Sequence, residues 1–233
     1  MKQFLFLFFT VIILTSCRFT TGSGNIVFET RNPGSFDAIA VGGSFDVEVK
    51  VGDIASVIVE ADDNIIKYIE TRVSGNTLKI RTEGLHNYSD VHMKVYVTVP
   101  SLSSISASAS ADVVVNNILT SISRLTFKAS SSASIKAEVN APEIETEANS
   151  SATITLSGKT KSHKTQASSS ADIKTFDLLS ENTTASVSSS ASIQVHASVN
   201  LNAKASSSGS IEYKGAASVS KSESSSGSVD KKD

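Results

Sequence analysis

Two aspartates recur at the same position of a serine-rich repeat, and paired carboxylates are the groups with which many polysaccharide-cleaving enzymes act. Asp112 and Asp172 each follow a run of small residues and precede a β-branched residue. They are three repeats apart, so coils stacked at about 4.8 Å would separate them by about 14 Å. Paired glycosidase carboxylates lie about 5 to 9.5 Å apart. We therefore expect Asp112 and Asp172 to be turn or surface residues, and we predict no catalytic residues.

Other reactive residue types show no pattern typical of an active site. The four histidines share no spacing: His86, His92, His163 and His196. The sequence contains no nucleophile elbow, phosphate-binding loop or dinucleotide fingerprint, so no cofactor is expected. Asp62 and Asp63 could chelate Ca²⁺, but two adjacent acids without further oxygen ligands are a weak signal. We expect them to form a helix cap rather than a metal site, with Asp63-Asn64 capping a short helix.

The single cysteine lies directly after an apolar N-terminal segment. Lys2 precedes Phe4–Leu14, which is almost purely apolar and too short to span a membrane, and Leu14-Thr15-Ser16-Cys17 follows. This arrangement resembles the lipobox of bacterial lipoproteins. It implies a signal peptide over residues 1–16, lipidation of the Cys17 thiol and a lipidated tether over residues 17–24. We therefore expect an exported protein anchored through Cys17 in the cell envelope, at the outer membrane and facing the periplasm or the outside.

Composition narrows the remaining classes of function. The formal net charge is −2, with acidic and basic residues interspersed, so we expect no nucleic-acid partner. One cysteine allows no intramolecular disulfide. Trp is absent and aromatic residues become sparse after residue 100. A conventional globular core is therefore not expected in residues 101–233.

A repeat fills residues 101–233. Its units end in hydrophobic residues spaced 22, 19, 19, 20, 18 and 18 residues apart, namely Val113, Ile135, Ile154, Ile173, Ile193, Ile211 and Val229. Within each unit apolar and polar residues alternate with the period of a β-strand. A repeat of this length with this alternation predicts an all-β, right-handed parallel β-helix with coils of about 19 residues. The alternative is a disordered serine-rich linker, which would not keep its apolar residues in phase.

The alternation also predicts which side chains face inward and which lie outside. On the inner face it places Phe127, Ala129, Ser131, Ala133 and Ile135. On the outer face, serines of successive coils should stack into a rigid hydroxyl strip about 25 to 30 Å long. The expected binding face consists of Ser130, Ser132, Ser168, Ser170, Ser188, Ser190, Ser206 and Ser208. It could bind a glycan or a protein surface or order water, or the serines could simply pack at tight corners.

Residues 25–100 have larger side chains and longer strand-like runs. Val47–Val51 and Met93–Val99 alternate as strands do, and Gly75-Asn76 is typical of a tight turn. Gly43–Val47 is a faint version of the later repeat. Because both ends of a β-helix expose strand edges, we expect these residues to form an N-terminal β cap and the first coils of one continuous structure.

Several of these segments together resemble a known family. They are the lipobox, Phe36–Ile39, Gly43–Val49, Asn76–Ile80, Val95–Leu102 and the Ser-Ala-Ser-Ala-Asp-Val ladder. The chain resembles the family of exported bacterial proteins described as "putative auto-transporter adhesin, head GIN domain". The resemblance implies a β-helical exported protein and suggests adhesion. We expect a non-catalytic, lipid-anchored envelope protein that binds surfaces; the alternatives are a β-helical polysaccharide-active enzyme and a purely structural or sensing periplasmic protein. The oligomeric state is left open.

Overall fold

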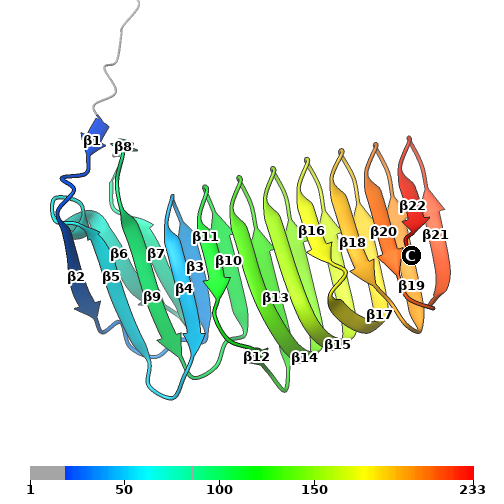
Figure 1. Cartoon of the computed structure of the whole chain (residues 1–233), viewed down its shortest axis with the longest axis horizontal. Helices are drawn as coiled ribbons and strands as arrows, with labels where there is room; N and C mark the ends of the chain where they lie inside the picture. The colour runs from blue at the N-terminus through cyan, green and yellow to red at the C-terminus, as the bar shows by residue number, and fades with distance from the viewer. Residues whose placement is uncertain (1–18, 85–86) are drawn as a thin grey trace, which may run out of the picture.

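The computed structural model describes residues 19–84 and 87–233, and these residues form an elongated β-solenoid (Figure 1). Its one helix in the described ranges is the single 3₁₀ turn η1, Ile66–Tyr68. Each coil consists of a strand, a tight turn, a second strand and a bend that leads to the next coil. The all-β solenoid predicted from the repeat is therefore confirmed. Its strands stack in parallel along the repeat.

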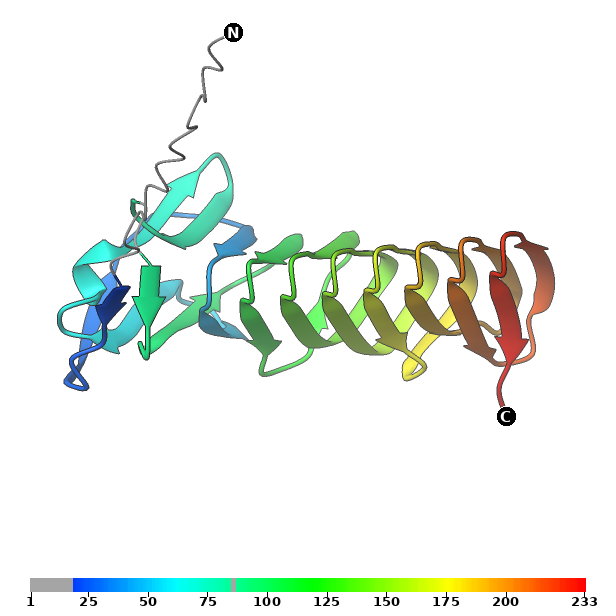
Figure 2. The same cartoon turned by 90° about the horizontal axis from the view of Figure 1, so that it is seen from above.

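The strands form two ladders that face each other across the core (Figure 2). The first ladder contains the strands that lead into the tight turns: β7 (Thr77–Thr82), β3 (Ala38–Gly42), β10 (Ser104–Ser108), β13 (Arg124–Ala129), the C-terminal parts of β14 (Ser134–Ala148) and β15 (Thr153–Ala167), β17 (Leu178–Val187), β19 (Asn200–Ala205) and β21 (Ser218–Glu223).

The second ladder contains the strands that follow the turns: β9 (Met93–Val99), β4 (Asp46–Val51), β11 (Asp112–Val115), the N-terminal parts of β14 and β15, β16 (Asp172–Thr175), β18 (Ser192–His196), β20 (Ser210–Lys214) and β22 (Ser228–Lys231). The short strand β12 (Leu119–Thr120) pairs with β14 at a bend.

Stacked columns of identical residues fill the core. Ile135 pairs in register with Ile154, Ile154 with Ile173, and the column continues through Ile193 and Ile211. All five side chains are at most 1% exposed. Each buried isoleucine contributes about 1.5 to 3 kcal/mol of hydrophobic stabilisation relative to an exposed one. The register also places opposite charges side by side on the outer face, with Lys128 beside Glu147 and Glu145 beside Lys164.

The first coils are not stacked in chain order. The β3–β4 coil lies between the β7–β9 coil and the β10–β11 coil, because β3 pairs with β7 and β10, and β4 with β9 and β11. After the β3–β4 coil, the chain forms the strands of the cap and then the β7–β9 coil. It next passes the β3–β4 coil on its way to β10. Ser103, in this crossing, donates its backbone N–H and its hydroxyl to the carbonyl of Asp37.

Antiparallel strands close the N-terminal end. β2 (Ile26–Arg31) pairs with β5 (Ser56–Asp62), β5 pairs with β9, and β6 (Ile69–Ser74) pairs with β7. The predicted turn at Gly75 joins β6 and β7, and Gly75 has a φ of 62°. The short parallel pair β1 (Phe19–Thr21) and β8 (Asn87–Ser89) lies beside this cap.

Charged side chains close the C-terminal end. In one inward-facing column, Ala185 stacks on Ala203 and Ala203 on Lys221. In the next column, Val187 stacks on Ala205 and Ala205 on Glu223. Lys221 Nζ lies 3.2 Å from Glu223 Oε1, whose carboxylate accepts the backbone N–H of Val229 at 2.7 Å. Charges at core positions of a terminal strand oppose further stacking, because a stacked coil would have to bury them.

Candidate functional site

Seven tight turns, each with two consecutive non-glycine residues at positive φ, lie in a row along one edge of the solenoid (Figure 1). In every turn the two central residues have φ between 47° and 68°, in the left-handed region. Thirteen of these fourteen residues are serines and the other is Ala109. The N–H of the fourth turn residue donates to the carbonyl of the first, at 2.9 to 3.4 Å.

The position of the middle serine corrects one prediction. Strand alternation placed Ser131 on the inner face with Ala129 and Ala133, but Ser131 is exposed at the tip of its turn. The chain must reverse between the two ladders, and it does so through the two left-handed residues Ser131 and Ser132. Ala129 and Ala133 on either side are buried as predicted. This ridge of turn residues, at positions 108–111, 130–133, 149–152, 168–171, 188–191, 206–209 and 224–227, is called the serine ridge below.

Backbone hydrogen bonds hold the turns of neighbouring coils in register. The Ser132 N–H donates to the Ser150 carbonyl at 3.0 Å, and the same bond repeats along the ridge from Ser110 to Ser208. The predicted serines therefore stack in two columns. The half-buried first turn residues are Ser130, Ser168, Ser188 and Ser206, and the exposed third turn residues are Ser132, Ser170, Ser190 and Ser208. That they bind a ligand stays a prediction.

Several hydroxyl and N–H groups of the serine ridge have no hydrogen-bond partner among the described residues, so they are available to a ligand. Within the described residues, no protein partner is found for the hydroxyls of Ser130, Ser168, Ser188 and Ser206, whereas Ser108 donates to the carbonyl of Val41. The backbone N–H of the first tip residue, such as Ser131, likewise has no backbone acceptor among the residues described. Most coils thus present the same hydroxyls, and each presents one tip N–H, at the strand spacing of about 4.8 Å.

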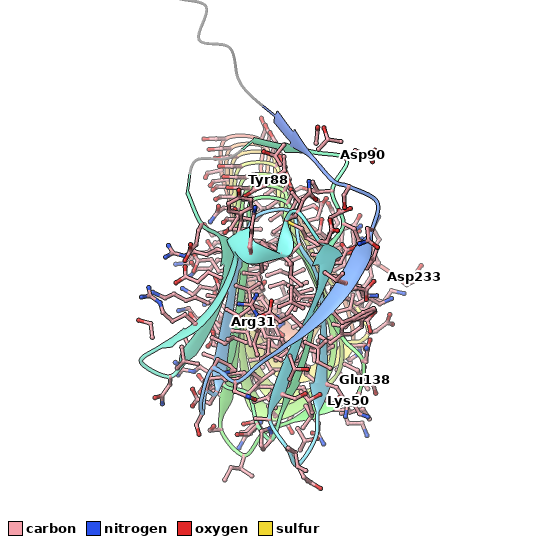
Figure 3. The ribbon with its side chains drawn as sticks, turned by 90° about the vertical axis from the view of Figure 1, so that its left-hand side faces the viewer. Arg31, Lys50, Tyr88, Asp90, Glu138 and Asp233 are labelled. Carbon is pink, nitrogen blue, oxygen red and sulfur yellow. The ribbon has the colours of Figure 1, made fainter. Side chains whose placement is uncertain are left out.

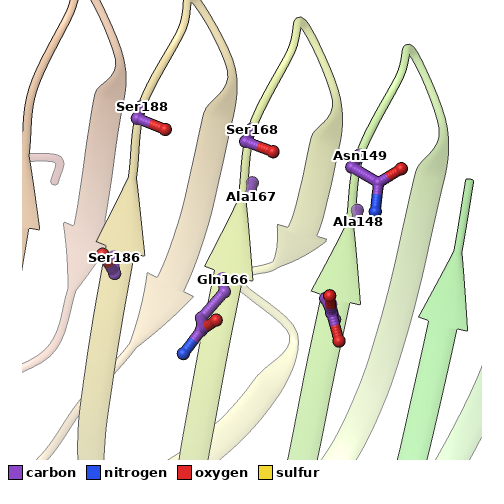
Figure 4. A pocket seen from close by; sticks show the side chains of 8 residues that line it. Ala148, Asn149, Gln166, Ala167, Ser168, Ser186 and Ser188 are labelled. Carbon is purple, nitrogen blue, oxygen red and sulfur yellow. The ribbon is translucent and has the colours of Figure 1, made fainter.

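A shallow groove runs along the outer side of the first ladder, just below the ridge (Figure 4). One hollow of about 150 Å³ is lined by Glu147, Ala148, Asn149, Gln166, Ala167, Ser168, Ser186 and Ser188. A second hollow of about 180 Å³ continues the groove toward the cap and is lined by Ser106, Ala107, Lys128, Ala129, Ser130, Glu147 and Asn149. Three predicted serines, Ser130, Ser168 and Ser188, therefore line a groove.

The groove also contains residues outside the predicted binding face. Lys128, Glu147, Gln166 and Ser186 form its lower wall, because each lies two residues before a first turn residue and points to the same side. The repeat spacing contained this signal. Lys128 Nζ lies 2.8 Å from Glu147, and this hydrogen bond raises the pKa of Lys128. Beyond this pair the lining of the groove is uncharged.

The predicted separation of the two aspartates agrees with the register. Asp112 and Asp172 lie in one outer column of the second ladder, with Ser134 and Thr153 between them. Each aspartate accepts a hydrogen bond from the serine of the following coil, Ser134 to Asp112 and Ser192 to Asp172. The two carboxylates are thus not brought together. Within residues 19–84 and 87–233, no three His, Cys, Asp or Glu side chains gather as a metal site.

The Asp62–Asn64 segment is not a helix cap, which corrects the prediction. Residue Ile65 precedes η1 and no side chain caps it. Asp62 instead accepts the backbone N–H groups of Gly24 and His92 with its two oxygens, both at 2.7 Å. Asp63 accepts hydrogen bonds from the side chains of Ser23 and Asn25, which lower its pKa. These carboxylates hold the N-terminal segment.

Cys17 and the four histidines singled out in the sequence lie away from the serine ridge or outside the described residues. Cys17 and His86 lie outside the described residues, and no helix in the described part is long and apolar enough to cross a membrane. His163 is fully buried in the core, and burial lowers its pKa to about 4. His92 Nε2 lies 2.7 Å from Glu60 on the cap, and His196 is the last residue of β18.

The sequence and the fold place the chain in a family. Residues 35–217 match the family described as "putative auto-transporter adhesin, head GIN domain". The chain belongs to this family. The solved structure of a "putative adhesin" from Bacteroides fragilis is similar with a TM-score of 0.84 at 20% identity, covering 91% of this chain and 98% of that one.

Other solved structures share the fold. A "putative lipid binding protein" from Parabacteroides distasonis has a TM-score of 0.77 at 23% identity and covers 93% of this chain and 100% of that one. A "putative adhesin" from Parabacteroides merdae has a TM-score of 0.74 at 19% identity and covers 92% and 99%. No curated protein matches the chain. These likenesses establish that the head GIN fold spans nearly the whole described chain.

Proposed function

We propose that this head GIN protein is a non-catalytic, lipid-anchored adhesin of the cell envelope, which binds neutral hydroxyl-rich polymers along the serine ridge and its groove. Membership of an adhesin family supports the adhesive role. The separation of Asp112 from Asp172 supports the absence of catalysis, because two coils stand between them. The lipobox around Cys17 supports anchoring through a lipid on that residue, at the outer membrane.

The single observation that carries the binding site is the choice of residue at the turn tips. A residue other than glycine in the left-handed region costs about 1 to 2 kcal/mol. Tight turns of this kind favour Asn-Gly or Gly-Gly. Here serine occupies thirteen of fourteen such positions. Strain that recurs in every coil indicates a role for the hydroxyl that glycine could not fill.

The chemistry of the ridge and groove defines the class of ligand. Hydroxyls both donate and accept, the free tip N–H groups donate, and Asn149 and Gln166 add amides. Most of the groove has no charge to attract or repel ions. A repeat of identical groups on successive coils fits an extended polymer that offers the same hydroxyls many times, so weak contacts add through multivalency. A neutral polysaccharide has these properties.

Serine-to-glycine variants separate binding from folding. Ser131→Gly and Ser132→Gly remove two hydroxyls and keep the turn, because glycine adopts positive φ without strain. We expect stability to be unchanged or to rise by about 1 kcal/mol per site, while binding to neutral polysaccharides on a glycan array falls. Repeating the change at Ser207 and Ser208 should weaken binding further. Thermal unfolding followed by circular dichroism verifies the fold.

The matched control is Ser123→Gly, an exposed serine on a bend at the opposite edge. It should leave both binding and stability unchanged. Variants of the ridge that bind the array as well as the unaltered protein would refute the site. Anchoring is tested separately, since Cys17→Ser should move the protein from the detergent phase to the aqueous phase in a phase-partition assay.

A further inference from the structure

The segment that follows the lipid-attachment residue is fixed to the cap. Phe19–Thr21 form β1, which pairs in parallel with β8. The Thr21 hydroxyl lies 3.2 Å from the Ser89 hydroxyl. Phe19 is two residues from Cys17, so the covalent chain allows at most about 7 Å between them. Residues 17–24 were predicted to form a tether, but residues 19–24 pack on the folded cap.

Three consecutive residues on the cap, Asp62, Asp63 and Asn64, clasp this segment. Ser23 donates its hydroxyl to Asp63 at 2.6 Å and its N–H to Asn64 at 3.1 Å. Asn64 in turn donates to the carbonyl of Thr21 at 2.9 Å. Asp62 is 2% exposed, and it accepts the N–H of Gly24. Hydrogen bonds to carboxylates are about twice as strong as neutral ones, so the clasp holds the segment firmly.

Gly22 shows how closely the segment fits. Its N–H donates to the carbonyl of Asp90 at 3.2 Å. A Cβ at Gly22 would lie 2.5 Å from Asp62 Oδ2 and 2.6 Å from the Asp90 carbonyl oxygen. Only glycine allows this approach, and any side chain there would push the segment off the cap.

We propose that this clasp sets the orientation of the rod on the bilayer that carries the lipid of Cys17, with the cap against the lipid head groups and the C-terminal coil farthest away. This inference rests on the proposed lipidation. A clasped segment leaves only Arg18 and Cys17 between the cap and the acyl chains. The lipid is therefore attached within two residues of the folded cap, and not at the end of a long linker. In Figures 1 and 3, β1 lies at the cap end and at the edge that carries the ridge.

The long sides of the rod lack the surface features that would make it adsorb flat on the bilayer. Adsorption to a membrane needs apolar area or basic charge. The serine ridge, on the side of β1, offers neither, since its turn residues are Ser, Ala, Asn and Gly. The exposed aliphatic side chains of Ile118, Ile122 and Val199 lie on bends at the opposite edge, and Leu179 lies at the start of β17, directly after such a turn. A rod held only at the cap projects the groove away from the membrane, toward ligands.

Energy transfer from single labels to the membrane tests the orientation. The thiol of Cys17 is consumed by the lipid, so Ser131→Cys and Ser225→Cys each supply one site for a donor dye at exposed turn tips. The two tips are five coils, or about 24 Å, apart along the axis. The acylated proteins are reconstituted in phosphatidylethanolamine–phosphatidylglycerol vesicles that carry a head-group acceptor dye. We expect strong transfer from position 131 and weak transfer from position 225.

Variants of the clasp complete the test. Gly22→Ala and, independently, Asp63→Ala should reduce the difference in energy transfer between the two labels, because the released segment then acts as a flexible linker. Gly42→Ala is the matched control, since its Cβ would meet only the Ser108 hydroxyl at an ordinary 3.6 Å. Equal transfer from both labels in acylated protein would overturn the orientation alone. Protein that carries no lipid in the detergent-partition assay would overturn the anchoring, and the orientation with it.

Discussion

A buried histidine should make the solenoid less stable in mild acid than at neutral pH. His163 lies inside the core, in the column between Ile144 and Thr183. Its Nε2 lies 3.1 Å from the Thr146 hydroxyl, and its Nδ1 has no partner among the described residues. Burial lowers the pKa of His163 to about 4. The imidazole is therefore neutral in the folded protein over most of the physiological range.

The magnitude follows from the linkage between protonation and folding. In the unfolded chain the histidine has a pKa of about 6.5, so between pH 6.5 and 4 the unfolded state binds more protons than the folded state. Stability is then fully present above about pH 6.5 and falls as the pH is lowered toward 4. With a folded pKa of about 4, the loss is about 2 kcal/mol at pH 5 and reaches about 3.4 kcal/mol well below pH 4.

The assay compares urea unfolding of the unaltered protein and of His163→Gln at several pH values between 7.5 and 4.5, a range set by the two pKa values. Glutamine can still hydrogen bond to Thr146 but does not titrate. The variant should lack the loss of about 2 kcal/mol between pH 7 and pH 5. Carboxylates with lowered pKa, such as Glu60 and Glu145, affect both proteins alike. Parallel stability curves for the two proteins would refute the assignment.

Two further predictions concern the ends and the bends of the rod. Lys221→Ala with Glu223→Ala restores the small residues of the preceding coil, and we expect end-to-end association that sedimentation velocity detects; a monomeric double variant would contradict the capping role. Gly158→Ala should cost more than about 4 kcal/mol in thermal unfolding, because its Cβ would lie 2.0 Å from the Val139 carbonyl oxygen. Gly34→Ala, with positive φ but open space, should cost only about 1 to 3 kcal/mol.

The sequence predicts the stacked core of the repeat because stacking places like residues on like. Ile135, Ile154 and Ile173 form one column at the spacing read from the sequence, and Lys128 pairs with Glu147 for the same reason. One repeat per coil therefore determines the register of both ladders. The same spacing places the serine columns side by side.

The tip of the turn could not be predicted from alternation. Period-two alternation runs through Ser131 without a break, and serine is a weak signal for positive φ compared with glycine or asparagine. What decides its conformation is the need to reverse the chain between two facing ladders, which only the complete coil imposes. The hydroxyls expected on an outer strip of the strands consequently lie on a ridge of turns and in the groove below it.

The N-terminal region was harder to predict because its contacts are long-range. Asp63 contacts Ser23, 40 residues earlier, so nothing local distinguishes this clasp from a helix cap. The crossing of the chain over the β3–β4 coil likewise depends on pairing with strands that come later in the sequence. Local signals identified Gly75 as a turn and Met93–Val99 as a strand, but not the order in which the coils stack.

The two closed ends determine where this protein can interact. Antiparallel β2 and β6 end the ladders on the cap side, and Lys221 with Glu223 ends them on the other. Another parallel coil is therefore disfavoured at either end, and we expect binding along the length of the rod. Each additional coil adds one more serine turn in the same register. Affinity for an extended polymer should then grow with the number of coils engaged, which explains why a strained turn would be repeated and not replaced by glycine.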